Sequence, residues 1–209
     1  IHIDTKDGVL RAEAEGLINI AEVEGDLVIE SLNTRGNALI TADGSIYDLQ
    51  SANASITAKD ITLVSENGGI GTADNDLTLD SLDGVLTARA KDGIYLTETS
   101  KTMRVNRVAS ADGDVALIAD GSIEGSNTSG MTGEEANFSG RNITLISNAN
   151  IGSYGGTAII DKADIASGNV TPEERTLLVR AEKGEAVYEE QGNVVISLDQ
   201  DFAIQASGR

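Results

Sequence analysis

The chain has 209 residues, of which 40% are hydrophobic, so it is long enough to bury a continuous core. Its formal net charge of −19 argues against nucleic acid or an anionic membrane as a partner, because both require a basic surface. It contains no cysteine, which excludes disulfides and cysteine nucleophiles, and its single histidine is His2. No apolar run approaches the ~20 residues of a membrane-spanning helix.

Short runs in which apolar and polar residues alternate predict β-strands along most of the chain. Each run is three to five residues long, is bounded by Gly, Asp, Asn or Ser, and starts eight to eleven residues after the previous one. No stretch before residue 160 holds apolar residues at helical spacing for three turns. After a first strand at 17–20, the side chains expected to point together into the core are Leu27 and Ile29, Leu39, Ile61 and Leu63, Leu77 and Leu79, Ile94 and Leu96, Val115 and Leu117, Ile143 and Leu145, Val194 and Ile196, and Phe202 and Ile204.

The chain also repeats itself over a long period. The phrase VLTARAKDGIYLTE at residues 85–98 has an earlier version at 9–22 and a later one at 177–190. GNALITADGSI starts at residue 36 and returns as GDVALIADGSI from residue 113, an offset of 113 − 36 = 77. DITLVSENGGIG and NITLISNANIG are 142 − 60 = 82 residues apart. The repeating unit is therefore about 80 residues long and tolerates insertions.

Regularly spaced short strands fit an antiparallel sandwich or barrel, or a coil of parallel strands. An 80-residue repeat that stops partway through a further copy favours the coil, since a parallel β-helix can end anywhere. We therefore interpret residues 1–209 as one all-β domain, a parallel β-helix with units of about 9–84, 85–176 and a partial 177–209. Three strands per turn would give each unit three turns, or four tighter ones, with like residues such as Gly44 and Gly121 stacked at one corner. Because the pattern is already running at the first residue, we expect an internal segment of a longer protein.

Two insertions interrupt the second unit and predict loops on one face of the coil. They cover residues 124–141 and 161–176, and either loop is a candidate for contacts with a partner. The second contains TPEER, in which Thr171 as N-cap and Pro172 at the first helical position predict one short helix near residues 172–176.

A polysaccharide-cleaving enzyme is the enzymatic alternative, because many such enzymes are β-helices. Their chemistry needs either paired carboxylates at a set separation or a Ca²⁺ site with a basic residue beside it. The candidate acids are Asp43, Asp120 and Asp114, and the candidate bases are Arg89 and Arg180. Asp43 recurs as Asp120, and Arg89 recurs as Arg180. Because one active site does not need periodic copies, we interpret these residues as structural and assign no catalytic, cofactor-binding or metal-binding residue.

Calcium is the one cofactor for which the sequence offers a loose motif. Residues 67–76, NGGIGTADND, and residues 111–114, ADGD, resemble Asp-rich turn loops, but stacked Gly-Gly-x-Gly-x-Asp repeats do not occur. The alternatives are an occasional Ca²⁺ ion held by turn acids and solvated turn acids without an ion, and we favour the second.

Three phrases together, GDVALIADGSIEG, ITLVSENGGIGTADNDLTLDS and LTARAKDGIYLTE, are similar to the repeat region of large filamentous adhesins. The chain resembles the filamentous-haemagglutinin-like exoproteins of bacterial two-partner secretion, especially leukotoxin-type filamentous adhesins. The resemblance implies a right-handed parallel β-helix, export through an outer-membrane transporter, and a secreted or cell-surface location. It implies a monomeric, virulence-related stalk that attaches to a host-cell receptor, matrix protein or glycan, and it carries no catalytic signature.

Overall fold

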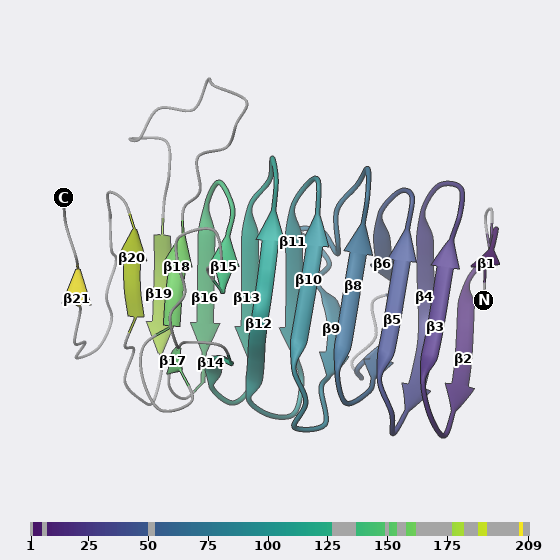
Figure 1. Cartoon of the computed structure of the whole chain (residues 1–209), viewed down its shortest axis with the longest axis horizontal. Helices are drawn as coiled ribbons and strands as arrows, with labels where there is room; N and C mark the ends of the chain where they lie inside the picture. Colours follow the sequence, from purple (N-terminus) through teal and green to yellow (C-terminus); the bar gives the residue numbers. More distant parts are fainter. Residues whose placement is uncertain are drawn as a thin grey trace.

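The computed structural model describes residues 2–5, 8–49, 53–126, 137–148, 151–153, 158–161, 177–181, 188–191 and 205–206, and all regular structure among them is β-strand. Successive parallel strands stack into a β-solenoid whose two ends carry the two termini (Figure 1). The predicted all-β parallel β-helix is confirmed. The described part of the chain contains no helix with the length and hydropathy needed to cross a membrane.

The strands form two sheets, and neighbouring strands within each described ladder run parallel. The 12-stranded sheet contains β1 (His2–Ile3), β3 (Ile18–Glu22), β5 (Ala38–Ala42), β8 (Ile61–Ser65), β10 (Leu86–Ala90), β12 (Met103–Ser110), β14 (Ile123–Gly125), β15 (Phe138–Ser139), β17 (Ile151–Ser153), β18 (Ala158–Asp161), β20 (Tyr188–Gln191) and β21 (Gln205–Ala206). The nine-stranded sheet contains β2 (Leu10–Ala14), β4 (Leu27–Thr34), β6 (Ile46–Asp48), β7 (Ile56–Thr57), β9 (Leu77–Asp80), β11 (Ile94–Glu98), β13 (Val115–Ala119), β16 (Ile143–Ser147) and β19 (Leu177–Ala181).

The predicted three strands per turn occur in the turns β5–β6–β7, β13–β14–β15 and β16–β17–β18, whereas turns such as β3–β4 and β8–β9 place one strand in each of the two sheets. The arrows of one sheet point up in Figure 1 and those of the other point down. The eight-residue strand β4 pairs with both β6 and β7, and the equally long β12 pairs with both β14 and β15.

One repeat unit spans three and a half turns of this solenoid. β2, β4, β7 and β9 are successive neighbours in the nine-stranded sheet, so three turns separate β2 from β9, and β10 follows half a turn later in the other sheet. β10 repeats the sequence of β2 at an offset of 86 − 10 = 76. The same path leads from β10 through β12, β15 and β18 to its own copy, β19. Equivalent strands of successive units therefore lie in opposite sheets.

This half-turn offset also corrects the expected stacking of Gly44 on Gly121. A Cβ at Gly44 would lie 2.6 Å from the carbonyl oxygen of Gly25, whereas a Cβ at Gly121 would lie 2.7 Å from that of Lys101. Both glycines permit a close approach of neighbouring turns. They do so at different corners, because β5 and β13, which precede them, belong to different sheets.

The core is one continuous cluster of aliphatic side chains between the two sheets. Leu27, Ile29, Ile61, Leu63, Leu77, Leu79, Ile94, Leu96, Leu117, Ile143 and Leu145 are 0% exposed and Val115 is 1% exposed, as predicted. Leu39 is an exception: Ile40 is buried instead, and Leu39 lies on the partly exposed outer side of β5. In the run ALITA the inward positions are occupied by the two alanines and the isoleucine. The prediction from the leucine therefore assigned the outward side of the strand to the core.

Val194, Ile196, Phe202 and Ile204, and the short helix predicted near residues 172–176, lie outside the described residues. The insertion predicted at 124–141 includes the end of β14 and all of β15, and these two strands belong to the core. Phe138, for example, is 0% exposed. The second insertion separates β18 from β19.

Candidate functional site

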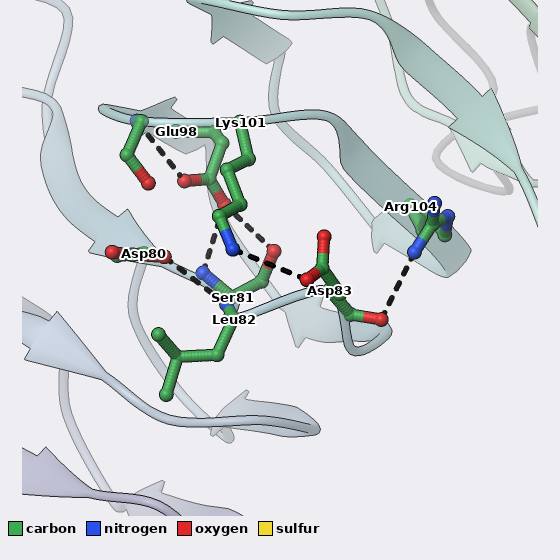
Figure 2. Close-up of polar contacts among 8 residues, drawn as sticks. Asp80, Ser81, Leu82, Asp83, Glu98, Lys101 and Arg104 are labelled. Atoms are coloured by element: carbon green, nitrogen blue, oxygen red, sulfur yellow. Dashed lines mark hydrogen bonds and ion pairs between the residues drawn. The ribbon is translucent and has the colours of Figure 1, made fainter.

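Buried polar side chains gather at the corners where strands end, and Glu98 is the most enclosed of the described acids. It is the last residue of β11, shares the inward face with Ile94 and Leu96, and is 0% exposed. Its Oε2 atom accepts hydrogen bonds from the main-chain N–H of Ser81 at 3.0 Å and from the Ser81 hydroxyl at 2.8 Å (Figure 2). Oε1 accepts one from the N–H of Ser100 at 3.3 Å. The carboxylate thus ties β11 to the turn that follows β9.

That turn, residues 81–84, is fixed from several directions (Figure 2). Leu82 and Asp83 have φ angles of 42° and 65°, which non-glycine residues rarely adopt. The Leu82 N–H donates to Asp80 Oδ1 at 3.1 Å, which stabilises the turn from within. From the next turn, Lys101 Nζ lies 3.1 Å from Asp83 Oδ2 and Arg104 Nη1 donates to the Asp83 carbonyl at 3.0 Å. We interpret the strained backbone as a consequence of this anchoring.

The environment of Glu98 changes its acidity. Burial raises the pKa of Glu98, and the negative charge of Asp80 raises it further, while the bonds from Ser81 and Ser100 lower it. The balance is a raised pKa, because three hydrogen-bond donors compensate only in part for lost hydration. A raised carboxyl pKa in a cleft would suggest a general acid. Glu98 instead lies sealed in a corner, so the shift reports desolvation inside the stack.

Asp48 holds a second polar corner at the end of β6 and is 5% exposed. Its Oδ2 atom accepts hydrogen bonds from the hydroxyls of Ser55 and Thr78, both at 2.8 Å, and from the Thr78 N–H at 3.0 Å. Asn75 Nδ2 donates to Oδ1 at 3.1 Å. Thr78 belongs to β9, in the turn after Asp48, so this carboxylate also bonds from one turn to the next.

Hydroxyl groups hold further corners in the same way. In each case a buried Ser or Thr at the end of a strand donates to a main-chain carbonyl of the preceding turn. The pairs are Thr34 with Gly16, Ser65 with Gly44 at 2.7 Å, Ser110 with Asp92 at 2.7 Å, and Ser147 with Gly121 at 2.8 Å. These positions recur between units, and together with Glu98 and Asp48 they stabilise the stacking of turns.

Each candidate enzymatic residue whose side chain is described has its own partners, and no hydrogen bond or ion pair of the described residues joins two of them. Asp43 follows β5 and accepts a hydrogen bond from Asn67 at 2.9 Å, whereas its repeat partner Asp120 follows β13 in the other sheet. Asp114 accepts bonds from Arg141 and Asn142, both at 2.9 Å. Arg89 forms an exposed ion pair with Glu66 at 3.2 Å, and the Arg180 side chain lies outside the description.

Neither Asp-rich loop forms a cation cage in the described residues, where no three His, Cys, Asp or Glu side chains converge as metal ligands. In the loop at 67–76, the Asn75 amide is directed at Asp48 and Asp76 accepts a hydrogen bond from Thr97 at 2.9 Å. Burial is the main cause that raises the pKa of Asp76, with the nearby charge of Asp48 as a further cause.

An open groove of about 420 Å³ lies where β2 and β4 end, and Glu13, Thr34, Arg35 and Leu82 help to line it. The ion pair between Arg35 and Glu15 beside it is exposed on both sides and has an N···O distance of 3.8 Å. The described residues that line the groove include no aromatic ring on which a sugar could stack.

Sequence reasoning missed Glu98 and Asp48, although a signal for both was present. Alternation at period two places Glu98 on the same face as Ile94 and Leu96, and Asp48 on the same face as Ile46. An acid at an inward position predicts a buried, hydrogen-bonded carboxylate. Comparison with known proteins adds no further assignment: no family model, curated protein or solved structure matches this chain.

Proposed function

We propose that this chain is a non-catalytic structural segment of a filamentous adhesin, secreted or displayed at a bacterial surface, which gives reach and presents loops for host-cell attachment. The observation that carries the proposal is the use of its buried polar groups. Glu98, Asp48 and the corner hydroxyls bond from one turn to the next, which is what a stable rod requires. Each turn also covers the strand edges of its neighbours, so lateral pairing is satisfied along the stack.

The surface supports the same role. Among the described residues, six ion pairs, for example Arg11 with Glu30 and Arg104 with Glu124, join side chains of adjacent turns, while the net charge of −19 opposes sideways association of rods. The likeness of the repeat phrases to filamentous adhesins supports the surface location and the export through an outer-membrane transporter. Under this proposal the insertions at 124–141 and 161–176 contact a host receptor, matrix protein or glycan.

The experiment is a binding assay with the purified chain on epithelial cells, leukocytes, matrix proteins and a glycan panel. Two loop-excised variants accompany it, in which residues 127–136 or 162–176 are replaced by a short Gly-Ser linker. The first excision spares Ile123–Gly125 and Phe138, because these residues belong to the core. A thermal melt of each variant shows whether the rod is intact.

Saturable binding that disappears with one loop, at an unchanged melting temperature, supports an adhesive segment and locates its contact. Binding that survives both excisions contradicts the role of the loops. A chain that melts cooperatively but binds nothing is a passive stalk. Turnover of a polysaccharide by the purified chain would contradict the non-catalytic proposal and favour the alternative, a polysaccharide lyase or glycoside hydrolase.

A further inference from the structure

Tyr95 has an unusual position on the outer face of the nine-stranded sheet. It lies in β11 between Ile94 and Leu96, which are both 0% exposed, so its own side chain points outward and is partly exposed. The ring lies over Gly93, because a Cβ at Gly93 would be 2.6 Å from the ring atom Cε2 and 3.2 Å from the hydroxyl oxygen. Glycine at position 93 therefore lets the ring lie along the strand instead of standing away from the sheet.

The neighbouring strands carry small residues beside this ring. Ala116 of β13 is the register partner of Tyr95 on one side. On the other side Ile70 pairs with Ile94, so the next residue, Gly71, lies beside Tyr95. The side chains at this level are thus a methyl group and a hydrogen atom, and neither is large enough to cover the ring. The result is a partly exposed aromatic surface in the middle of a sheet.

Charged side chains border the hydroxyl end of the ring. Asp114, which precedes β13, accepts hydrogen bonds at Oδ1 from Arg141 Nε and Asn142 Nδ2, both at 2.9 Å. Burial raises the pKa of Tyr95, the charge of Asp114 raises it further, Arg141 lowers it, and Asp76 raises it again. The three charged groups therefore act on the phenol from close by. Asp114 and Arg141 are 29% and 41% exposed, so both are accessible to a ligand on the ring.

The first unit of the repeat shows that the fold does not require this arrangement. The equivalent of Tyr95 is Asn19, at 95 − 19 = 76, and the equivalent of Gly93 is Leu17, at 93 − 17 = 76. The same strand therefore forms with a small amide in place of the ring and a large side chain in place of the glycine. Because the repeat dictates neither residue, a role in binding accounts for the tyrosine and the glycine beneath it better than a role in folding.

This combination of groups matches the chemistry of a pyranose sugar. The apolar C–H groups on one face of the sugar ring pack against an aromatic ring. Its neighbouring hydroxyls match a carboxylate, which only accepts hydrogen bonds, beside a guanidinium, which only donates them. Among the described residues, no hydrogen bond occupies Asp114 Oδ2 or the Nη atoms of Arg141. Asp114 and Asp76 would repel an anionic sugar, so the ligand that fits is neutral.

We propose that the outer face around Tyr95 binds one neutral pyranose unit of a glycan. The sugar ring stacks on Tyr95, and its hydroxyls bond to Asp114 Oδ2 and to the guanidinium of Arg141. The inference goes beyond the proposed function, which assigns partner contacts to the insertions, because this site lies on a sheet and uses none of residues 127–136 or 162–176. A second copy of the chain is a less suitable occupant, since its net charge of −19 would meet the carboxylates of the site.

The first test is an NMR titration of the isotope-labelled full chain with the methyl glycosides of glucose, galactose, mannose and N-acetylglucosamine at millimolar concentration. Methyl glucuronide is the matched charged probe, because a carboxylate replaces one hydroxymethyl group of the glucoside. We expect at least one neutral glycoside to shift the amide signals of Gly93, Tyr95 and Ala116, and the glucuronide to leave them in place. If no neutral glycoside shifts these signals, or if the glucuronide binds more tightly than the glucoside, the proposal is overturned.

Tyrosine variants test the stacking surface. Tyr95→Phe keeps the ring and should bind as the parent chain does, whereas Tyr95→Asn, which copies Asn19, should bind about tenfold more weakly, the effect of one aromatic contact. Tyr47→Asn is the matched control, because Tyr47 is also an outward-facing tyrosine of the nine-stranded sheet but has Val28 beside it in the register. The control should bind like the parent chain, and a thermal melt checks that each variant is folded. Equal affinities of Tyr95→Asn and Tyr47→Asn would overturn the proposal.

Asp114→Asn tests the polar edge of the site and copies Asn37 of the first unit, at 114 − 37 = 77. We expect about fivefold weaker binding, because a charged acceptor becomes a neutral one. The two loop-excised variants separate this site from the insertions. Both keep Asp114 and Arg141, so the glycoside should still bind to each of them, even where binding to host cells is lost. Loss of the glycoside from a loop-excised variant with an unchanged melting temperature would overturn the proposal, because an insertion would then hold the sugar.

Discussion

The two units of the repeat fill an equivalent corner, in opposite sheets of the solenoid, with different chemistry. In the first unit, Asp48 occupies it and bonds forward to Ser55 and to Thr78 of the next turn. In the second unit, the equivalent of Asp48 is Gly125, at 125 − 48 = 77, and the equivalent of Ser55 is Asn137, at 137 − 55 = 82.

Asn137 fills the corner from the opposite direction. It is 0% exposed, and its Nδ2 atom donates backward to the carbonyls of Val105 and Asn106, each at 3.0 Å. A Cβ at Gly125 would lie 2.6 Å from Asn137 Oδ1, so the glycine makes room for the amide. The repeat therefore keeps the space and its polar character, while the residue that supplies the polar group and the turn to which it bonds are interchangeable.

Removing the carboxylate should have the largest effect. We expect Asp48→Ala to lower the free energy of unfolding by ~2–4 kcal/mol, because the part-buried Thr78 N–H and two hydroxyls lose a charged acceptor. Urea unfolding measures the loss. The control is Asp43→Ala, an exposed acid with one side-chain partner, which should change stability by less than ~0.5 kcal/mol. Equal losses in the two variants would contradict a special role for the corner.

Transferring the arrangement of the second unit into the first tests whether the Asp48 carboxylate and the Asn137 amide are alternative ways to fill this corner. Ser55→Asn alone should cost ~1–3 kcal/mol, because the larger amide would compete with Asp48 for one space. In the Asp48→Gly background, which copies the second unit, the same substitution should cost less or stabilise. A double-mutant cycle by urea unfolding should therefore give a coupling energy of ~0.5–3 kcal/mol. Additive effects would show that the corners are independent.

The corner held by the Glu98 carboxylate should respond to pH, whereas an amide corner should not. The pKa of Glu98 in the folded chain lies above its ordinary value of 4.5. Between these two values the folded state binds the extra proton, so stability falls as pH rises through the folded pKa and is highest below the unfolded one. We expect acidification from neutral pH to stabilise the parent chain relative to Glu98→Gln, measured as the difference in melting temperature. A difference that stays constant with pH would contradict the assignment.

The smallest effect is expected at the surface. Arg89 and Glu66 are 66% and 57% exposed, so Arg89→Ala should cost less than ~0.5 kcal/mol, and added salt should reduce even that. Denaturant melts at low and high salt measure it. A loss comparable with that of Asp48→Ala would mean that surface ion pairs, and not the buried corners, hold the turns together.

The sequence was sufficient to predict parallel strands and most of the core, because period-two alternation identifies the inward face and the long repeat excludes a sandwich. It was not sufficient to predict the number of sheets. Alternation within a strand carries no information about which other strand pairs with it. A sequence repeat also suggests that each unit completes a whole number of turns, so that equivalent strands would lie in the same sheet. The half turn in this repeat becomes visible only in the pairing of β8 with β10 and of β16 with β13.

The polar corners were predictable in part. Glu98 lies two residues after Leu96, on the inward side of its strand. The alternation of inward and outward side chains therefore predicts that Glu98 is buried. Its partner Ser81 is 17 residues away, and Thr78, the partner of Asp48, is 30 residues away. These separations depend on the length of each turn, which local patterns do not determine. Among the described register pairs it ranges from 205 − 189 = 16 residues between Glu189 and Gln205 to 177 − 143 = 34 between Ile143 and Leu177.

The half-turn offset between the units is the central structural claim, and cysteine cross-linking tests it most directly, because the chain contains no cysteine of its own. Ile118 and Ile146 are outward-facing register partners in the nine-stranded sheet, and Ala109 faces outward in the other sheet. Neighbouring strands lie ~4.8 Å apart, within the reach of a disulfide. The account predicts rapid oxidation of the Ile118→Cys/Ile146→Cys pair and none of Ala109→Cys/Ile146→Cys. Cross-linking of the second pair would place β16 beside β12, in the sheet of its copy β8, and would contradict the offset.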